Sequence, residues 1–441
     1  MSNRNILTIL GLLMGMAYYG QDLNSSPYTR FGLGEQVPMV STPFIGLGGA
    51  NVAVSDFKYI NFSNPATYSN TKRYSPVFDA GVMGKSSFLR STNGSFNKTT
   101  VALRDFSLLL PISPKTGFAF GLMPYSTTGY DINDYDPNEG DTITYTYSGM
   151  GSVNRLFFGL GQQIWTRGDS VKLSLGVNAS FLFGTLQRDR LVEFDEATFV
   201  NTHLKNKLLI RGFSIDYGLH YFEKISEKLN YQIGLTVNLG NKVTAYQDFF
   251  AYTYTLNSIE EEIISDTTKY YEDNKGYVQL PKSFTIGGAV TMNKRVTLSA
   301  QFEIADHYKY YEYFDSTEFY YNELAQMKKV SFGIRIMPES GLDLKNVSAL
   351  KLISYQIGAN YGYAPYQSND IHLKQYGIAF GISLPLLSSG ASSTLNLGFE
   401  LGKLGTTDNG LIEDNYFKFN LGLSLMAHNR FDKWFWKRLY D

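Results

Sequence analysis

Hydrophobic and polar residues alternate with a period of two along most of the chain after residue 74. In the clearest run, hydrophobic positions alternate with small or polar ones: Phe417, Phe419, Leu421, Leu423 and Leu425 with Lys418, Asn420, Gly422 and Ser424. Successive side chains of a β-strand point to opposite faces, so this pattern predicts a strand with one apolar face. The alternation recurs at 171–181, 231–239, 296–304 and 376–384.

The length of these runs distinguishes a membrane barrel from a soluble sandwich. They extend for about nine to fifteen residues, which is the length that a tilted strand needs to cross a bilayer, whereas sandwich strands have about five or six residues. A strand that faces lipid must have all its backbone groups paired, so the sheet must close on itself. We therefore predict an all-β fold, a transmembrane antiparallel β-barrel of about fourteen strands that occupies residues 75–427.

The connections between the predicted strands differ in length. We place the strands at roughly 75–87, 99–112, 116–127, 150–166, 169–187, 206–223, 228–246, 277–291, 295–309, 327–338, 348–362, 372–387, 393–404 and 414–427. Long connections are expected at 88–98, 128–149, 188–205, 247–276 and 310–326, and short ones at 113–115, 167–169, 223–228, 292–294 and 387–392. In outer-membrane barrels the long loops lie outside the cell. The link from Met337 to Ala349 is longer than a turn, which indicates either a periplasmic docking loop or an error in the strand count.

The first twenty residues are expected to direct export. The run Ile6–Gly20 is apolar but too short to span a hydrocarbon core of roughly 30 Å. Residues 1–20 are therefore interpreted as a cleaved signal peptide, with Gly20 at the cleavage site. An exported chain with long amphipathic strands is predicted to lie in the bacterial outer membrane, in contact with its lipid.

Residues 21–74 do not alternate and are rich in Gly, Pro, Ser and Asn. A barrel of fourteen strands has a lumen too wide to be filled by wall side chains alone. We therefore expect this segment to fold back into the lumen as a plug, or hatch. The last segment, 428–441, is aromatic and basic and is predicted to be a periplasmic tail.

Composition limits the possible chemistry. The chain has 43% hydrophobic and 18% charged residues, with a mean hydropathy of -0.19. Its formal charge of -1 provides no field to attract nucleic acid, and its lack of Cys excludes thiol catalysis and disulfides. The five His residues show no metal-ligand spacing, and no nucleophile elbow or phosphate loop is present. We predict no catalytic residue, cofactor or metal site, and no enzyme activity.

Within the expected plug, short motifs stand in a definite order. The segment 45–50 contains Gly46, Gly48, Gly49 and Ala50, and Asp56 and the turn Asn64, Pro65 and Ala66 follow it. This order resembles the hatch of the FadL-type family of outer-membrane transport proteins. The resemblance implies uptake of hydrophobic small molecules such as long-chain fatty acids, and a third strand that kinks open. Gly121 and Pro124 are candidates for that kink; alternatively, the strand simply ends there.

Both ends of the chain resemble one branch of that family. The segment Ser25–Gly34 and the tail residues Trp434, Phe435, Trp436, Lys437 and Arg438 are similar to a branch found in bacteria with type 9 secretion. One member of that branch is a plug subunit bound to the secretion translocon, so the resemblance implies an accessory subunit with that partner. The tail residues are candidates for contact with either the inner-leaflet surface or a periplasmic partner.

Ionisable residues of both signs fall on the predicted inner face, namely Arg155, Lys172, Asp216, His220, Glu303, Arg335, Glu400 and Lys418. Mixed charges favour a network that packs the plug against the wall over a substrate path. Two functions therefore remain: a plugged accessory barrel of the type 9 translocon, and a channel for hydrophobic small molecules. A transporter requires a continuous apolar pocket, whereas an occluding subunit does not.

Overall fold

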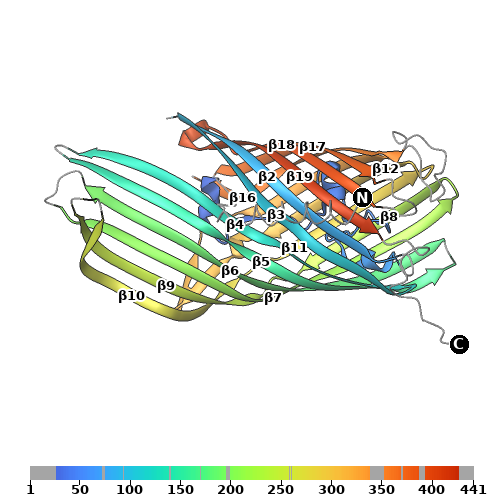
Figure 1. Cartoon of the computed structure of the whole chain (residues 1–441), viewed down its shortest axis with the longest axis horizontal. Helices are drawn as coiled ribbons and strands as arrows, with labels where there is room; N and C mark the ends of the chain where they lie inside the picture. The colour runs from blue at the N-terminus through green and yellow to red at the C-terminus, as the bar shows by residue number, and fades with distance from the viewer. Residues whose placement is uncertain are drawn as a thin grey trace, which may run out of the picture.

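The computed structural model describes residues 26–71, 75–92, 94–138, 141–168, 170–194, 199–257, 259, 261–337, 352–368, 371–386 and 393–426. Among them, fourteen antiparallel strands form a closed barrel (Figure 1). These strands are β2 (Val77–Ser91), β3 (Gly94–Ser113), β4 (Thr116–Asn138), β5 (Asp141–Arg167), β6 (Val171–Phe194), β7 (Asn201–Ser226), β8 (Leu229–Asn238), β11 (Ser283–Met292), β12 (Val296–Asp306), β15 (Gln326–Ile336), β16 (Ser354–Ser368), β17 (Ile371–Pro385), β18 (Thr394–Leu404) and β19 (Glu413–Met426).

The barrel closes between its last strand and its first. Strand β19 pairs with β2 along its whole length, from Glu413 opposite Arg90 to Met426 opposite Val77. This closure leaves no open edge within the barrel at the seam, as a lipid-facing sheet requires. The prediction of an antiparallel barrel with about fourteen strands is confirmed.

The alternating pattern separates an apolar outer face from a polar inner face. On β15 the exposed side chains from Val330 onward are hydrophobic: Val330, Phe332, Ile334 and Ile336 are 39–61% exposed. Between them, Ser331 and Arg335 are 1% and 4% exposed and point into the lumen. An apolar belt outside and polar side chains inside characterise a transmembrane barrel. Among the described residues, no helix is both long and apolar enough to cross a membrane.

The prediction of long loops was wrong for three of the ranges. Residues 128–149, 188–205 and 247–276 lie mostly in strands, and β4 and β5 stay paired without a register shift from Ser126 opposite Val153 to Asn138 opposite Asp141. The reason is that backbone pairing continues where the apolar alternation stops, since no lipid faces the sheet there. Runs such as 142–147, with Thr, Ile and Tyr, retain a strong strand preference.

Residues 88–98 and 310–326 also contain paired strands. In the first range β2 and β3 extend to Ser91 opposite Gly94, and in the second a small hairpin joins β13 (Tyr311–Phe314) to β14 (Thr317–Tyr320). Two further strands, β9 (Lys242–Leu256) and β10 (Glu262–Gln279), prolong β8 and β11 beyond the barrel. Strands β4–β7, β9 and β10 therefore project from one end of the barrel, at the left of Figure 1. We call this part the extension.

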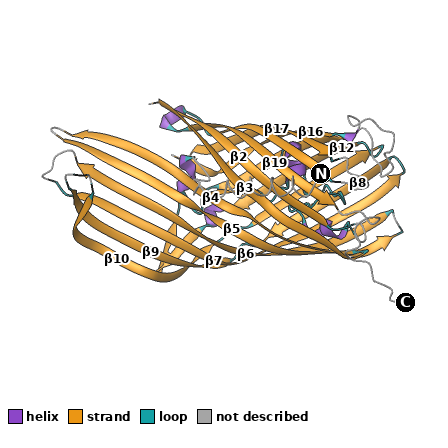
Figure 2. Ribbon diagram, in the orientation of Figure 1, coloured by secondary structure: helices purple, strands orange, loops and turns teal. Residues whose placement is uncertain are grey.

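The N-terminal segment 26–71 packs against the barrel wall, and we call it the plug. Its elements are η1 (Pro27–Arg30), β1 (Glu35–Gln36), η2 (Thr42–Leu47) and η3 (Pro65–Ser69). Helix η2 contacts β15–β19, and η3 contacts β4–β7, so the plug reaches opposite sides of the wall (Figure 2). Two other short helices, η4 (His307–Lys309) and η6 (Asp408–Gly410), lie in connections between strands.

Candidate functional site

The plug and the surrounding wall form the candidate site, beginning with the glycine motif on η2. Gly48 ends η2 in the left-handed conformation, with φ 62° and ψ 21°, a backbone conformation that side chains disfavour. A Cβ at Gly48 would also lie 2.7 Å from the Ala359 nitrogen of the wall. Gly46 lies against the Gly381 backbone, where a Cβ would collide. Glycine therefore permits close backbone approach between plug and wall at both positions.

The Asn64, Pro65 and Ala66 turn attaches the other half of the plug. Asn64 Oδ1 accepts a hydrogen bond from the Ala66 nitrogen at 3.1 Å, which caps η3, and Pro65 occupies the first turn of that helix. Asn64 Nδ2 donates to the Val52 carbonyl at 2.9 Å and to the Leu219 carbonyl of β7 at 3.0 Å. One fully buried side chain thus caps a helix and links the plug to the barrel wall.

Small wall residues receive η3. Gly161, Gly176 and Gly218 on three neighbouring strands lie against Pro65 and its neighbours, and a Cβ at Gly161 would come 2.5 Å from the Pro65 carbonyl oxygen. No role is predicted for these glycines above. Their signal was available, because all three occupy inner-face positions of alternating runs.

Three wall glutamines, which were also missed, bind plug backbone. Gln301 Oε1 accepts hydrogen bonds from the Asn51 and Val52 nitrogens at 3.1 and 2.9 Å. Gln356 Nε2 donates to the Pro43 carbonyl at 2.6 Å, and Gln232 Oε1 accepts from the Ser55 nitrogen at 3.0 Å. Because buried backbone groups must be paired, these contacts hold a loop with little secondary structure of its own.

Charged side chains also join plug and wall, as expected from their mixed signs. Arg335 Nη1 lies 3.3 Å from Asp56 Oδ2, with both side chains at most 10% exposed. Arg104 donates through Nε to the Val40 carbonyl at 3.0 Å and through Nη1 to Asn420 Oδ1 at 2.8 Å. These contacts fix the plug against β15 and against the seam of the barrel.

At the rim, Tyr28 attaches η1 to the connection between β18 and β19. Its hydroxyl donates to the Ile412 carbonyl at 2.6 Å, and its ring stacks on Tyr366 with the centroids 5.8 Å apart. Burial raises the pKa of Tyr28 to about 12, so the hydroxyl remains protonated and able to donate at neutral pH.

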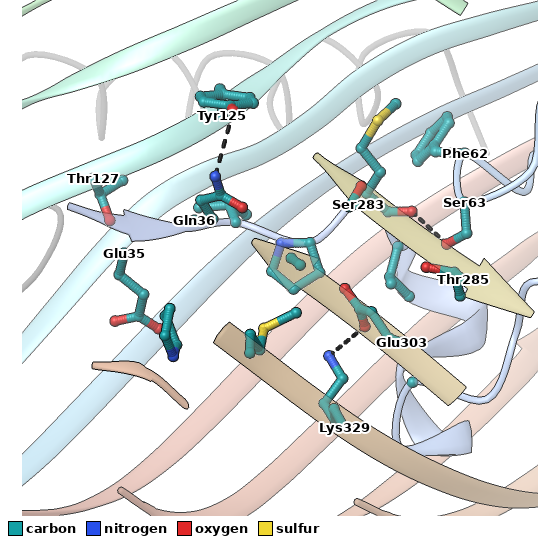
Figure 3. Close-up of a pocket in the computed structure, with 18 of the residues that line it drawn as sticks. Glu35, Gln36, Phe62, Ser63, Tyr125, Thr127, Ser283, Thr285, Glu303 and Lys329 are labelled. Atoms are coloured by element: carbon teal, nitrogen blue, oxygen red, sulfur yellow. Dashed lines mark hydrogen bonds and ion pairs between the residues drawn. The ribbon is translucent and has the colours of Figure 1, made fainter. Parts of the chain in front are cut away.

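A cavity of about 380 Å³ lies between the plug strand β1 and the wall. Three ion pairs involve residues that line it: Lys85 Nζ is 2.7 Å from Glu35 Oε2, Lys418 Nζ is 3.4 Å from Glu35 Oε1, and Lys329 Nζ is 2.8 Å from Glu303 Oε2. Figure 3 shows Glu303 and Lys329 facing each other across adjacent strands. Charged side chains therefore line part of this cavity, beside apolar ones such as Met39, Val40 and Leu182.

Gly121 and Pro124 lie on β4, near the point where β3 and β4 separate. Pairing between β3 and β4 ends at Phe106 opposite Leu122, and the register of β4 against β5 shifts between Pro124 and Ser126. Strand β4 nevertheless continues, and β1 pairs with its Ser126 and Thr127. The plug thus supplies a strand where β3 departs.

Several predicted features lie outside the described residues. These are the signal peptide 1–20, the link 338–351 and the tail 428–441 with Trp434, Phe435, Trp436, Lys437 and Arg438. Within the described ranges, no group of three or more His, Cys, Asp or Glu residues is arranged to hold a metal ion.

A closed fourteen-stranded antiparallel barrel, with an N-terminal segment held to its wall by glycine and asparagine turns, has the fold of a FadL-type barrel. The chain belongs to the BamG family, whose model matches residues 1–441. No match was found among curated proteins.

Three solved structures illustrate the fold that this chain shares. The Pseudomonas putida toluene transporter TodX is 13% identical, with 89% of this chain and 98% of that chain covered and a TM-score of 0.55. The CymD monoaromatic hydrocarbon channel is 11% identical, with 88% and 98% covered and a TM-score of 0.54. A Pseudomonas aeruginosa FadL homologue is 11% identical, with 90% and 99% covered and a TM-score of 0.53. At these identities the likeness concerns the fold.

Proposed function

We propose that this protein is a non-enzymatic, plugged accessory barrel of the bacterial outer membrane that works by binding other proteins. The observation that carries the proposal is the ion-paired cavity between β1 and the wall. Its residues Glu35, Lys85 and Lys418 meet within 3.4 Å, and Glu303 and Lys329 form a second pair.

An apolar molecule entering this cavity would displace water from charged groups and offer them no hydrogen bond in return. Desolvating charged groups without compensation is costly, so such a ligand is disfavoured there. The pocket of a hydrophobic channel instead carries a small number of polar groups, and not a cluster of ion pairs. The contacts of Asn64, Gln301 and Arg335 with both plug and wall further favour a plug that stays in place.

An uptake channel for hydrophobic small molecules such as long-chain fatty acids is the second candidate. It is favoured by the separation of β3 from β4 beyond Leu122, next to Gly121 and Pro124. It is also favoured by the fold that the chain shares with the CymD hydrocarbon channel and the toluene transporter TodX. In this alternative the plug strand β1 would have to leave Ser126 and Thr127 to open a lateral path.

The proposed partner of the accessory barrel is the type 9 secretion translocon, as indicated by the resemblance of the two chain ends. In this proposal the signal peptide is removed, the extension faces the outside of the cell, and the tail with Trp434 and Trp436 contacts a periplasmic component.

The decisive experiment combines copurification with uptake. The tagged full chain is extracted from membranes in mild detergent, and its partners are identified. The same preparation is reconstituted in liposomes and tested with a fluorescent long-chain fatty acid. The accessory role predicts a stoichiometric translocon and entry no faster than in protein-free liposomes. Faster entry with no copurified protein would overturn it in favour of the channel.

A further inference from the structure

The extension lies beyond the apolar belt of the barrel. On the outer face of β7 the exposed residues Phe213, Ile215 and Tyr217 are 41–61% exposed and apolar. Farther along the same face, towards the extension, the exposed residues are Lys207 and Arg211. A charged face is unsuited to lipid hydrocarbon, so the extension projects into water.

Because the extension is not closed, its outermost strands have open edges. Among the described residues, no strand pairs with the outer side of β10 between Glu262 and Asn274, nor with β4 after Thr127. Strand β3 also has an open edge, from Gly94 to Arg104, where it diverges from β4. Open edges expose unpaired N–H and C=O groups to any chain that can add a strand.

Two of these edges carry features that hinder strand addition. Strand β10 contains three register irregularities against β9 and bears Lys269 and Lys275. Strand β3 bears Lys98 and has an irregularity near Arg104. Bulges and lysines are the usual means by which proteins protect an edge. From Ser126 to Asp136, β4 has no irregularity, no lysine and no proline, and Pro137 ends this stretch.

The backbone groups that β4 offers can be identified from its existing contacts. The Tyr125 carbonyl accepts from the Val37 nitrogen at 2.9 Å, and the Gly129 nitrogen donates to Thr29 Oγ1 at 3.1 Å. The backbone N–H and C=O groups of odd-numbered residues therefore point to the open edge, and the unbroken register carries this orientation to Asp131, Asn133 and Tyr135. Of these groups, the Tyr135 nitrogen donates to Asp134 Oδ1 of its own strand at 3.0 Å, whereas its carbonyl points to the edge. All three side chains are exposed.

The plug already uses the start of this edge. Strand β1 pairs antiparallel with it, Glu35 opposite Thr127 and Gln36 opposite Ser126, and Thr29 bonds to Gly129. The next residues offer the same geometry to a second strand. The edge is therefore a partly filled strand-addition site.

The negative charge of the extension favours a basic strand as the one that pairs with the β4 edge. Residues 128–149 contain five Asp and Glu but no Lys or Arg, and 128–149, 188–205 and 247–276 together contain sixteen acidic against five basic residues. The whole chain, in contrast, has a charge of only -1. Two β4 edges from two copies would bring like charges together, which disfavours self-pairing.

We propose that the free edge of β4, from Asp131 to Tyr135, binds an extended basic segment of a partner protein by β-strand addition. Main-chain hydrogen bonds supply affinity, and Lys or Arg on alternate positions of the guest strand lie on the face that carries Asp134 and Asp136, opposite to the face of Asp131. This inference rests on the proposed accessory function and specifies the chemistry of its partner.

The test uses the full chain in nanodiscs of zwitterionic lipid and two labelled, blocked peptides. One peptide alternates Lys with Val, and the other has Glu in place of Lys. Fluorescence anisotropy should show the Lys peptide binding at least about tenfold more tightly, with affinity falling as salt increases. Asn133→Pro removes an edge N–H and inserts a ring there without breaking the β4–β5 ladder, so binding should fall about tenfold or more.

The matched control is Thr268→Pro, which lies at a register irregularity on the opposite edge and should bind as the parent does. A second variant, Asp131→Asn with Asp134→Asn and Asp136→Asn, keeps the backbone and should abolish the preference for the Lys peptide. Unchanged binding by Asn133→Pro, equal binding of both peptides, or a dimer of this chain that Asn133→Pro disrupts would each overturn the proposal.

Failure of this inference can be separated from failure of the accessory role. If a translocon copurifies equally with the parent and Asn133→Pro, strand addition at β4 is wrong and the accessory role stands. If the liposomes take up fatty acid and no protein copurifies, the accessory role itself is wrong.

Discussion

Arg335 on the barrel wall forms an ion pair with Asp56 of the plug, with Nη1 and Oδ2 3.3 Å apart in a site from which water is largely excluded. The two residues are far apart in the sequence, and each charge would be unfavourable alone. Removing one member of such a pair leaves the other buried and uncompensated.

Asp56→Asn should therefore destabilise the plugged barrel by about 3 kcal/mol, because Arg335 would remain charged without its counter-ion. The midpoint of heat-induced unfolding, followed by the gel mobility shift, measures this effect. Asp248→Asn is the matched control, since its pair with Lys207 is exposed and contributes at most about 1 kcal/mol. Equal midpoints for the two variants would contradict the structural role of the pair.

Gly161→Ala should loosen the plug, because its Cβ would stand 2.5 Å from the Pro65 carbonyl oxygen. Overpacking of this kind costs about 1–3 kcal/mol, and we expect single-channel recordings to show more frequent openings. Gly94→Ala, with open space around its Cβ, provides the comparison and should behave as the parent. If Gly161→Ala opened no more often than the parent and kept the same free energy of unfolding, the plug could move away from the new Cβ without loss of stability.

The free energy of unfolding should decrease as the pH is lowered, because of His307 at the start of η4. Burial lowers the pKa of His307 to about 4 from its usual 6.5, against the opposing effect of Glu303 and Asp306. Below about pH 6.5 the unfolded chain therefore binds a proton at this histidine, whereas the folded chain does so only near pH 4. Stability is lost progressively as the pH falls from 6.5 to 4. The full loss amounts to about 3 kcal/mol.

The check is the pH dependence of the unfolding midpoint in the parent and in His307→Gln. The variant should lack most of the decline between pH 6.5 and 4, although other carboxylates still contribute at the lower end. Parallel curves for the two proteins would show that His307 is not held neutral by burial.

Removal of residues 428–441 separates the two roles considered for the tail. If Trp434, Trp436 and Arg438 dock a partner, the truncated chain should still form a heat-modifiable barrel in the membrane while losing its copurified protein. A chain that fails to assemble but, once refolded in detergent, keeps its partner would reject docking. The substitution Lys437→Glu with Arg438→Glu tests whether the contact is electrostatic.

The sequence by itself determined the barrel, since alternation at positions such as 330–336 follows directly from the opposition of lipid and lumen. It also set the N-terminal segment apart, because residues 21–74 do not alternate and carry the glycines and the Asn64 turn. Where lipid no longer constrains the strands, as in 128–149, that pattern disappears and local reasoning assigned loops to what is paired sheet.

Only the tertiary structure decided what the plug touches. Gln301, Arg335 and Gly161 meet the plug because strands distant in sequence curve around it, and no local pattern encodes that proximity. The edge of β4 likewise depends on where β3 departs and β1 enters, which is a relation between three segments. The opposition of lipid and lumen produces a period of two in the sequence, whereas contacts between distant segments produce no local pattern.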